Sequence, residues 1–230
     1  MHMPSGTLFL IATPIGNLED ITLRALRILK ESEVIACEDT RHTAKLLSHF
    51  GISGKTLISF HSFSGGMKTE KILEMLQSGE NVALCSDAGT PGISDPGTAL
   101  ALSALEQGIQ ILPIPGATAL IPALSASGLP TDHFEFFGFL PHKKGRQTLI
   151  KKIVQIEHTV ILYESTHRIE KFLEEAFENF PKKQLVLARE LTKIYEEFLR
   201  GTAAELLEIL KKFPEKKKGE FVVLISGRKS

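Results

Sequence analysis

The sequence predicts an α/β protein, because short apolar runs alternate along the chain with amphipathic stretches at helical spacing. This alternation is typical of parallel strands joined by crossover helices, in which the strands are apolar throughout because helices cover both faces of the sheet. The 230 residues are 43% hydrophobic and 23% charged, a composition that excludes a disordered or collagen-like chain. The length predicts one or two domains.

The first half of the chain carries the clearest alternation. Strands are expected at residues 7–13, 34–37, 57–60, 82–86 and 109–114. We expect Asp20 to cap the first helix, whose inward side chains are Ile21, Ala25, Ile28 and Leu29. Further helices are expected at 42–50 and 68–77, and one that ends at Glu106 is expected to start with Asp95 as the cap and Pro96 in the first turn.

The second half has longer helical stripes and a different strand pattern. An aromatic strand is expected at 134–139, further strands at 160–163, 185–188 and 221–225, and a helix at 169–180. Thr202 and Glu205 have the spacing of a capping box ahead of another helix. Between the halves, proline and glycine are dense at 113–118, so we expect an N-terminal α/β domain with a parallel sheet at 1–115 and a C-terminal α/β domain with a mixed sheet at 116–230.

Composition excludes several classes of protein. Lysine plus arginine and aspartate plus glutamate both total 27, so the chain is not a globally basic nucleic-acid coat, although a local basic patch is compatible with neutrality. Two cysteines, Cys37 and Cys85, cannot form a disulfide scaffold or a four-cysteine zinc site, and their apolar flanks predict inert core thiols in a reducing cytoplasm. No metal site is expected. The uncharged stretch between Glu106 and Asp132 contains four prolines, which argues against a membrane span.

Three polar loops follow strands of the first half, at the carboxyl edge where open parallel sheets bind ligands. They are residues 13–17, residues 38–41 and residues 86–97, the last reading SDAGTPGISDPG. The glycines of the 86–97 loop allow the backbone to approach a ligand closely. The loop contains more glycines than a plain turn and helix cap require. Neither G-x-G-x-x-G nor G-x-x-x-x-G-K-S/T occurs, so a nucleoside would be bound by another geometry.

Charged groups follow the strands of the second half. Five cationic residues lie between His142 and Lys152 with no acid before Glu157. Such a run is commonly a solvated face, but beside a ligand cleft it suits a phosphate backbone. The runs at 164–168 and 189–193 are candidates for catalysis or RNA contact, with ion pairing between domains as the structural alternative.

Several motifs together resemble one family. They are ATPIGNLEDITLRAL at 12–26, EDTR at 38–41, SDAGTPGISDPG at 86–97, the stretch from Ser125 to Arg146, YESTHRI at 163–169 and ARELTKIYEE at 188–197. In this order they resemble the S-adenosylmethionine-dependent methyltransferases of the tetrapyrrole-methylase fold, and within them the group that methylates ribosomal RNA. The relatives that act on tetrapyrroles carry a first loop of the type G-x-G-P-G-D, which residues 13–17 do not match.

The resemblance implies two α/β domains with S-adenosylmethionine in the cleft between them, and a homodimer. The cofactor-binding residues it implies are Pro14, Asp87, Gly89, Thr90, Pro91, Ile93, Ser94, Ala117, Thr118 and Tyr163. The reaction it implies is methylation of the ribose 2′-oxygen of a cytidine in the decoding centre of 16S ribosomal RNA, within the small ribosomal subunit. The alternatives are methylation of a tetrapyrrole precursor and a non-catalytic assembly factor that binds the cofactor or RNA.

A ribose hydroxyl is a poor nucleophile until its proton leaves, so a base and a stabilising cation are expected. Asp39 or Glu190 is the expected base, and Arg41 or Lys193 the expected electrostatic support. The residues expected to contact RNA are Lys143, Lys144, Arg146 and Arg168.

Overall fold

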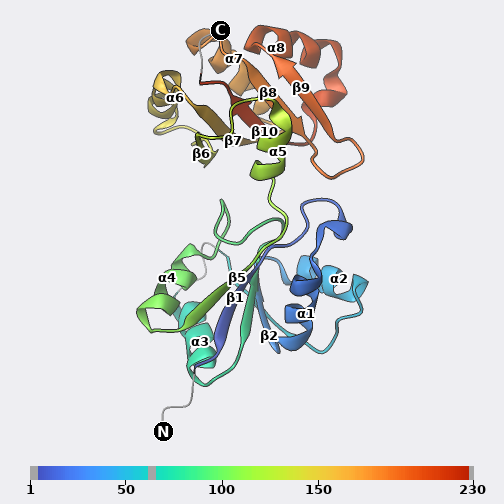
Figure 1. Cartoon of the computed structure of the whole chain (residues 1–230), viewed down its shortest axis with the longest axis vertical. Coiled ribbons are helices and arrows are strands. Elements are labelled where there is room, and N and C mark those ends of the chain that lie inside the picture. Colours follow the sequence, from blue (N-terminus) through green and yellow to red (C-terminus); the bar gives the residue numbers. More distant parts are fainter. Residues whose placement is uncertain (1–4, 62–65, 228–230) are drawn as a thin grey trace. The chain divides into compact units, whose positions relative to one another are not determined.

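The chain forms two compact units, Met1–Thr118 and Ala119–Ser230, each with its own sheet (Figure 1). The structure, a computed structural model, describes residues 5–61 and 66–227. The border between the units lies three residues after the one expected from the sequence. Over the described residues, no helix is long and apolar enough to cross a membrane.

The first unit is a five-stranded parallel sheet in the order β3-β2-β4-β1-β5. The strands are β1 (Thr7–Ile11), β2 (Val34–Cys37), β3 (Thr56–Ser59), β4 (Val82–Cys85) and β5 (Gln110–Ile114). The helices are α1 (Leu23–Glu31), α2 (Thr40–His49), α3 (Gly66–Gln77) and α4 (Thr98–Glu106), with a 3-10 turn η1 at Leu18–Asp20. The predicted parallel α/β arrangement is confirmed.

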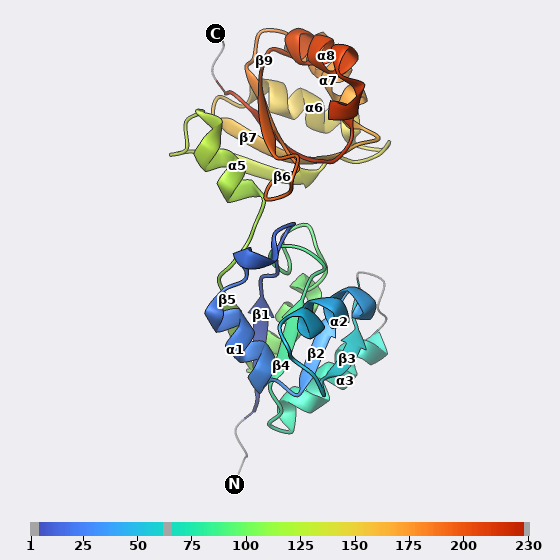
Figure 2. The same ribbon diagram turned by 90° about the vertical axis from the view of Figure 1, so that its right-hand side faces the viewer.

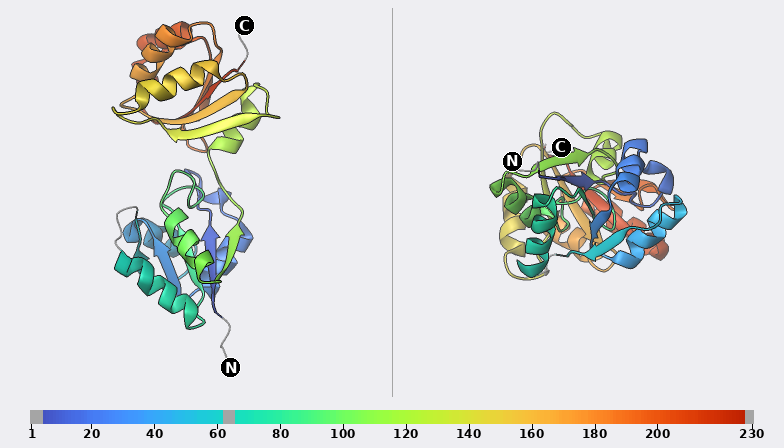
Figure 3. Two further views of the ribbon diagram at one scale, coloured as in Figure 1. Left: turned by 90° about the vertical axis from the view of Figure 1, so that its left-hand side faces the viewer. Right: turned by 90° about the horizontal axis from the view of Figure 1, so that it is seen from below.

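Helices cover both faces of this sheet, which explains why its central strands are buried along their whole length. One core joins α1 and α2 to strand residues such as Ile35 and Ala83, and a second joins α3 and α4 to Ala36 and Leu84. Figure 2 shows α1 and α2 in front of the sheet, and the left view of Figure 3 shows α3 and α4 in front of the opposite face. Both cysteines belong to the first of these cores, as predicted.

Two predicted helix starts are wrong. Thr22, not Asp20, caps α1, because its hydroxyl accepts a hydrogen bond from the Ala25 N–H at 3.1 Å, while Asp20 lies in η1. Likewise α4 begins at Thr98 after Gly97, so Asp95 is not a helix cap. Both errors arose because polar residues that suit a cap also suit the preceding loop.

The second unit has a mixed sheet in the order β6-β7-β10-β8-β9. Its strands are β6 (Phe134–Phe139), β7 (Thr159–Ser165), β8 (Leu185–Arg189), β9 (Glu197–Gly201) and β10 (Glu220–Ile225). Only β6 and β7 pair in parallel among the described strands of this sheet. The helices are α5 (Leu120–Ser127), α6 (Arg146–Gln155), α7 (Ile169–Asn179) and α8 (Ala203–Lys212), followed by a 3-10 turn η2 (Pro214–Lys217).

One core packs α6, α7 and α8 against the second sheet, and α5 packs against β8 and β10. The capping box of Thr202 and Glu205 is confirmed at the start of α8. Neither β9 nor α6 was predicted. β9 is half-exposed and bears charges at Glu197 and Arg200, and α6 follows Gly145 without a side-chain cap, so both lack the usual apolar or capping signals.

Candidate functional site

The loop at residues 86–97 is fastened to the loop that follows β1. Thr13 and Gly89 exchange two backbone hydrogen bonds of 2.9 Å, and the Thr13 hydroxyl donates to the Ser86 carbonyl at 3.1 Å. Gly89 has a φ of +83°, and Ser94 is a non-glycine residue with a φ of +64°. Left-handed backbone at a serine is uncommon and is a feature of shaped, functional loops.

Residues 115–118 form a second wall beside this loop, within the first unit. The Thr90 hydroxyl donates to the Ala117 carbonyl at 3.2 Å, and the Thr22 hydroxyl donates to the Pro115 carbonyl at 3.5 Å. A Cβ on Gly116 would lie 2.9 Å from the Ala12 Cβ, so the backbone at residue 116 can pass this close to Ala12 only because residue 116 is glycine. These contacts bring together Gly89, Thr90 and Ala117, three of the expected cofactor residues.

Carboxyl groups gather at the ends of β2 and β4. The Asp87 carboxylate accepts a hydrogen bond from the Asp39 N–H at 2.9 Å. Burial, together with the charge of Glu38, raises the pKa of Asp95 to about 6, and burial beside Asp87 also raises the pKa of Glu38. The sequence did not predict the raised pKa of Asp95, because an aspartate before a proline at a helix start has the pattern of a helix cap.

Asp39 and Arg41 form an exposed ion pair at the start of α2. The Arg41 guanidinium lies 2.7 Å from Asp39, and the Arg41 N–H also donates to it at 2.8 Å. These hydrogen bonds hold the pKa of Asp39 well below its usual range. A carboxylate of that kind stays charged and is a weak proton acceptor.

In the second unit, Glu190 and Lys193 lie in the loop between β8 and β9. The Lys193 ammonium is 3.0 Å from Glu190 and 2.8 Å from Glu220. Burial opposes the charge of Glu190, but hydrogen bonds from the Glu220 N–H and Lys193 outweigh it and lower the pKa of Glu190. Residue 190 has a φ of +49°, a second strained position in a loop singled out from the sequence.

The sequence of the chain matches a known protein family. The profile of the tetrapyrrole (corrin/porphyrin) methylases matches residues 7–207. The chain belongs to the tetrapyrrole methylase family. It is therefore a methyltransferase by family, and the resemblance of its motifs to that fold is confirmed.

Several relatives of the chain, among them the following three, are called ribosomal RNA small subunit methyltransferase I. The methylase is 48% identical to that of Halalkalibacterium halodurans, 47% to that of Escherichia coli O157:H7 and 50% to that of Synechocystis sp.. These matches cover 96%, 98% and 96% of the present chain and 76%, 79% and 79% of the relatives.

Solved structures match the fold of the methylase. Diphthine synthase superposes with a TM-score of 0.73 at 17% identity, over 96% of this chain and 90% of the other. Cobalt precorrin-4 methyltransferase superposes with a TM-score of 0.68 at 16% identity, over 96% and 94%. A uroporphyrin-III C-methyl transferase from Thermus thermophilus, complexed with S-adenosyl homocysteine, gives 0.64 at 17%, over 96% and 97%. At such identities these likenesses establish the fold alone.

The other expected cofactor residues of the methylase are distributed over both units. Pro14 follows the Thr13–Gly89 bridge, Pro91, Ile93 and Ser94 continue the 86–97 loop, and Thr118 ends the first unit. Tyr163 lies on β7, where its ring packs edge-on against Phe136 and Phe139, with centroids 4.9 and 5.6 Å away. The structure brings nine of the ten expected residues into the first unit and places Tyr163 in the second.

One expected RNA contact of the methylase is corrected by the structure. Arg146 is buried, with its guanidinium 2.6 Å from Glu175 and 3.9 Å from Glu164, so it is not available to a phosphate. The Arg168 guanidinium also has partners within the protein, because it pairs with Glu164 at 2.7 Å and donates a hydrogen bond to the Leu140 carbonyl. Lys143 and Lys144 are exposed.

Proposed function

We propose that this methylase transfers a methyl group from S-adenosylmethionine to the ribose 2′-oxygen of a cytidine in small-subunit 16S ribosomal RNA. The observation that carries the proposal is the identity of 45–50% with relatives called ribosomal RNA small subunit methyltransferase I, over nearly the whole chain. The tetrapyrrole methylases to which the chain can be superposed are only 16–22% identical, so they favour a porphyrinoid acceptor much less.

The residues of the first unit fit the proposed cofactor. The Asp87 carboxylate can accept hydrogen bonds from ribose hydroxyls, and Ile93, which is 40% exposed, offers an apolar surface to a purine ring. Neither Gly89, which faces Ile15 and the Ala117 carbonyl, nor Gly116, which faces Ala12, places a side chain between these loops. When bound, the cofactor supplies the activated methyl group, and the protein orients it and excludes water.

Removal of the hydroxyl proton needs a group whose pKa lies near the working pH. Asp39 and Glu190 have lowered pKa values and are held in ion pairs, so we assign them to holding Arg41 and Lys193 in place. The cations then stabilise developing negative charge. Asp95, half-buried with a pKa of about 6, is the better candidate for the base.

The proposal extends to assembly and location. It includes a homodimer, a small ribosomal subunit as the form in which the RNA is recognised, and a cytoplasmic site of action. Leu102 and Leu105 on α4 are 58% and 61% exposed and lie at i, i+3, which supports an interface on this helix. Sedimentation of the purified protein, with Leu102→Ser/Leu105→Ser as the comparison, tests the dimer.

The deciding experiment is transfer of labelled methyl from S-adenosylmethionine to small ribosomal subunits that lack the modification, followed by nucleoside analysis. We expect 2′-O-methylcytidine at one position. Confirmed cofactor binding without transfer to intact subunits would overturn the ribosomal assignment. Transfer to a porphyrinoid precursor instead would support the tetrapyrrole alternative, and binding without any turnover would support an assembly factor.

A further inference from the structure

One segment of the second unit is strongly basic although the chain as a whole is neutral. Residues 211–218, which read KKFPEKKK, contain five lysines and one glutamate, a formal charge of +4. They occupy the last turn of α8 and the η2 turn. We call them the 211–218 segment. A local charge of this size in a neutral chain is the electrostatic signature of a phosphate-binding surface.

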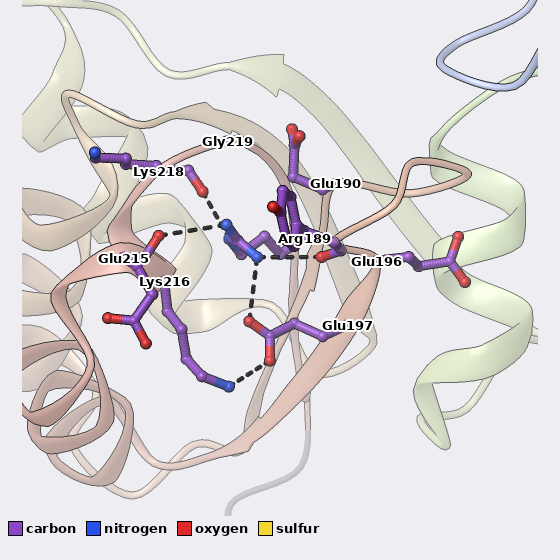
Figure 4. A pocket seen from close by; sticks show the side chains of 9 residues that line it. Arg189, Glu190, Glu196, Glu197, Glu215, Lys216, Lys218 and Gly219 are labelled. Carbon is purple, nitrogen blue, oxygen red and sulfur yellow. Dashed lines mark hydrogen bonds and ion pairs between the residues drawn. The ribbon is translucent and has the colours of Figure 1, made fainter.

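Three lysines of the 211–218 segment have no carboxylate partner among the described residues. Lys216 pairs with Glu197 and Lys217 with Glu170, whereas no ion pair is formed by Lys211, Lys212 or Lys218. Figure 4 shows the Lys218 side chain pointing away from Arg189 at the edge of the pocket. These three ammonium groups are therefore free to meet an anion.

One aromatic ring lies next to lysines of the 211–218 segment, and a second is exposed in the β8–β9 loop. Phe213, in the middle of the segment, is 40% exposed, and the ammonium groups of Lys212 and Lys216 are 5.4 and 5.6 Å from its ring centre. Tyr195, in the β8–β9 loop, is 70% exposed, and its neighbour Ile194 is 95% exposed. A solvent-exposed tyrosine ring in a loop can stack on another flat ring.

Arg189 fixes the β8–β9 loop against the 211–218 segment. Its guanidinium donates to the Lys218 carbonyl at 2.6 Å, the Tyr195 carbonyl at 3.1 Å and the Glu215 carbonyl at 3.3 Å (Figure 4). A pocket of about 570 Å³ lies among these residues. The Arg189 side chain is only 9% exposed, and its hydrogen bonds hold the backbone of the β8–β9 loop at Tyr195 close to the backbone of the 211–218 segment.

We propose that the 211–218 segment and the β8–β9 loop bind a single-stranded stretch of the RNA substrate. Lys211, Lys212 and Lys218 neutralise phosphates, and Tyr195 stacks on an unpaired base. Cations beside exposed aromatic rings are what single-stranded RNA sites use, whereas lysine is depleted in protein–protein interfaces. The inference rests on the proposed function, since it names the surface of the second unit on which the RNA substrate docks.

The test measures binding, which needs no methyl transfer. We compare the variant Lys211→Glu/Lys212→Glu/Lys218→Glu with the charge-matched control Lys30→Glu/Lys45→Glu/Lys71→Glu, whose three positions are exposed in the first unit. The probes are protein-free small-subunit ribosomal RNA and unmethylated small subunits. We expect the first variant to raise the dissociation constant at least tenfold and to reduce the log-log salt slope by about 2, as the loss of three single-strand phosphate contacts predicts. The control should do neither.

A second comparison isolates the ring. Tyr195→Ala is expected to weaken RNA binding about tenfold, and Tyr195→Phe, which keeps the ring, to restore it. Equal losses for both lysine triples, or an unchanged salt slope, would overturn the inference. So would weaker binding of subunits with unchanged binding of free RNA, which would indicate a ribosomal protein as the partner. If the parent binds RNA as described and transfers no methyl group, the proposed function fails while the docking surface stands.

Discussion

Thr13 and Gly89 are joined by two backbone hydrogen bonds of 2.9 Å, which connect the loop after β1 to the loop after β4. β1 and β4 are parallel neighbours in the sheet, and beyond the ends of both strands Thr13 and Gly89 form an isolated antiparallel bridge. The bridge holds the 86–97 loop at the carboxyl end of the sheet, and this pre-organises the loop for a ligand.

Replacing Gly89 with alanine tests this loop. The residue has a φ of +83°, where an L side chain is strained by roughly 1–2 kcal/mol, although a Cβ there would meet the Ile15 methyl only at 3.5 Å. We expect Gly89→Ala to weaken binding of S-adenosyl homocysteine about tenfold by calorimetry. Gly54→Ala is the matched control, because its φ is +74° in open space far along the chain. Equal affinity loss in both variants would contradict a role for the loop.

The hydroxyl of Thr90 offers a subtler test, because it ties the 86–97 loop to Ala117 at 3.2 Å. Thr90→Val removes the donor while keeping the shape, and loss of a hydrogen bond costs about 1 kcal/mol. Cofactor affinity is expected to fall several-fold in calorimetry, and Thr90→Ser, which keeps the hydroxyl, to recover most of it. If Thr90→Ser binds as weakly as Thr90→Val, the methyl group rather than the hydrogen bond is what matters.

Arg146 is expected to control stability instead of RNA affinity. It is buried with Glu175 and Glu164, and removing one member of a buried pair typically costs 3–5 kcal/mol because it leaves a charge uncompensated. Urea unfolding of Arg146→Met should show a loss of this size, and Arg146→Met/Glu175→Met a smaller one. By comparison, Lys143→Ala/Lys144→Ala should stay within about 0.5 kcal/mol of the parent. A fully stable Arg146→Met would show that the interior does not depend on the pair.

Asp95 predicts a pH-dependent stability. Because its folded pKa is raised to about 6 from 3.8, its protonated form favours the fold at low pH and this contribution is lost as the pH rises through 6. Asp95→Asn should therefore be more stable than the parent at pH 8, by on the order of 1 kcal/mol after allowance for solvent screening, and about equal to it at pH 4.

The same substitution tests the proposed base. In methyl-transfer assays the parent rate should rise with pH through about 6, and Asp95→Asn should be slow with no such rise. The control is Asp39→Asn, whose parent carboxylate stays charged throughout that range, so the shape of its pH profile should match the parent. A rise through pH 6 that survives in Asp95→Asn would remove Asp95 from the proton transfer.

The sequence by itself determined the fold class, nine of the ten described strands and the glycine-rich loop, because hydrophobic periodicity and glycine and proline positions are local signals. The buried runs at β2 and β4, the capping box at Thr202 and the inert cysteines all follow from residues that are neighbours along the chain.

Only the tertiary structure decided the properties that depend on partners far away in sequence. Arg146 reads as a phosphate contact until Glu175, 29 residues later, takes its guanidinium. Asp95 has the sequence pattern of a helix cap, and only the fold shows that burial and the charge of Glu38 raise its pKa. Tyr195 lies in the ARELTKIYEE motif, and only the fold shows that Arg189 donates hydrogen bonds to both the Tyr195 carbonyl and the Lys218 carbonyl. Burial and charge pairing are set by which segments meet in space, and local sequence patterns do not contain that information.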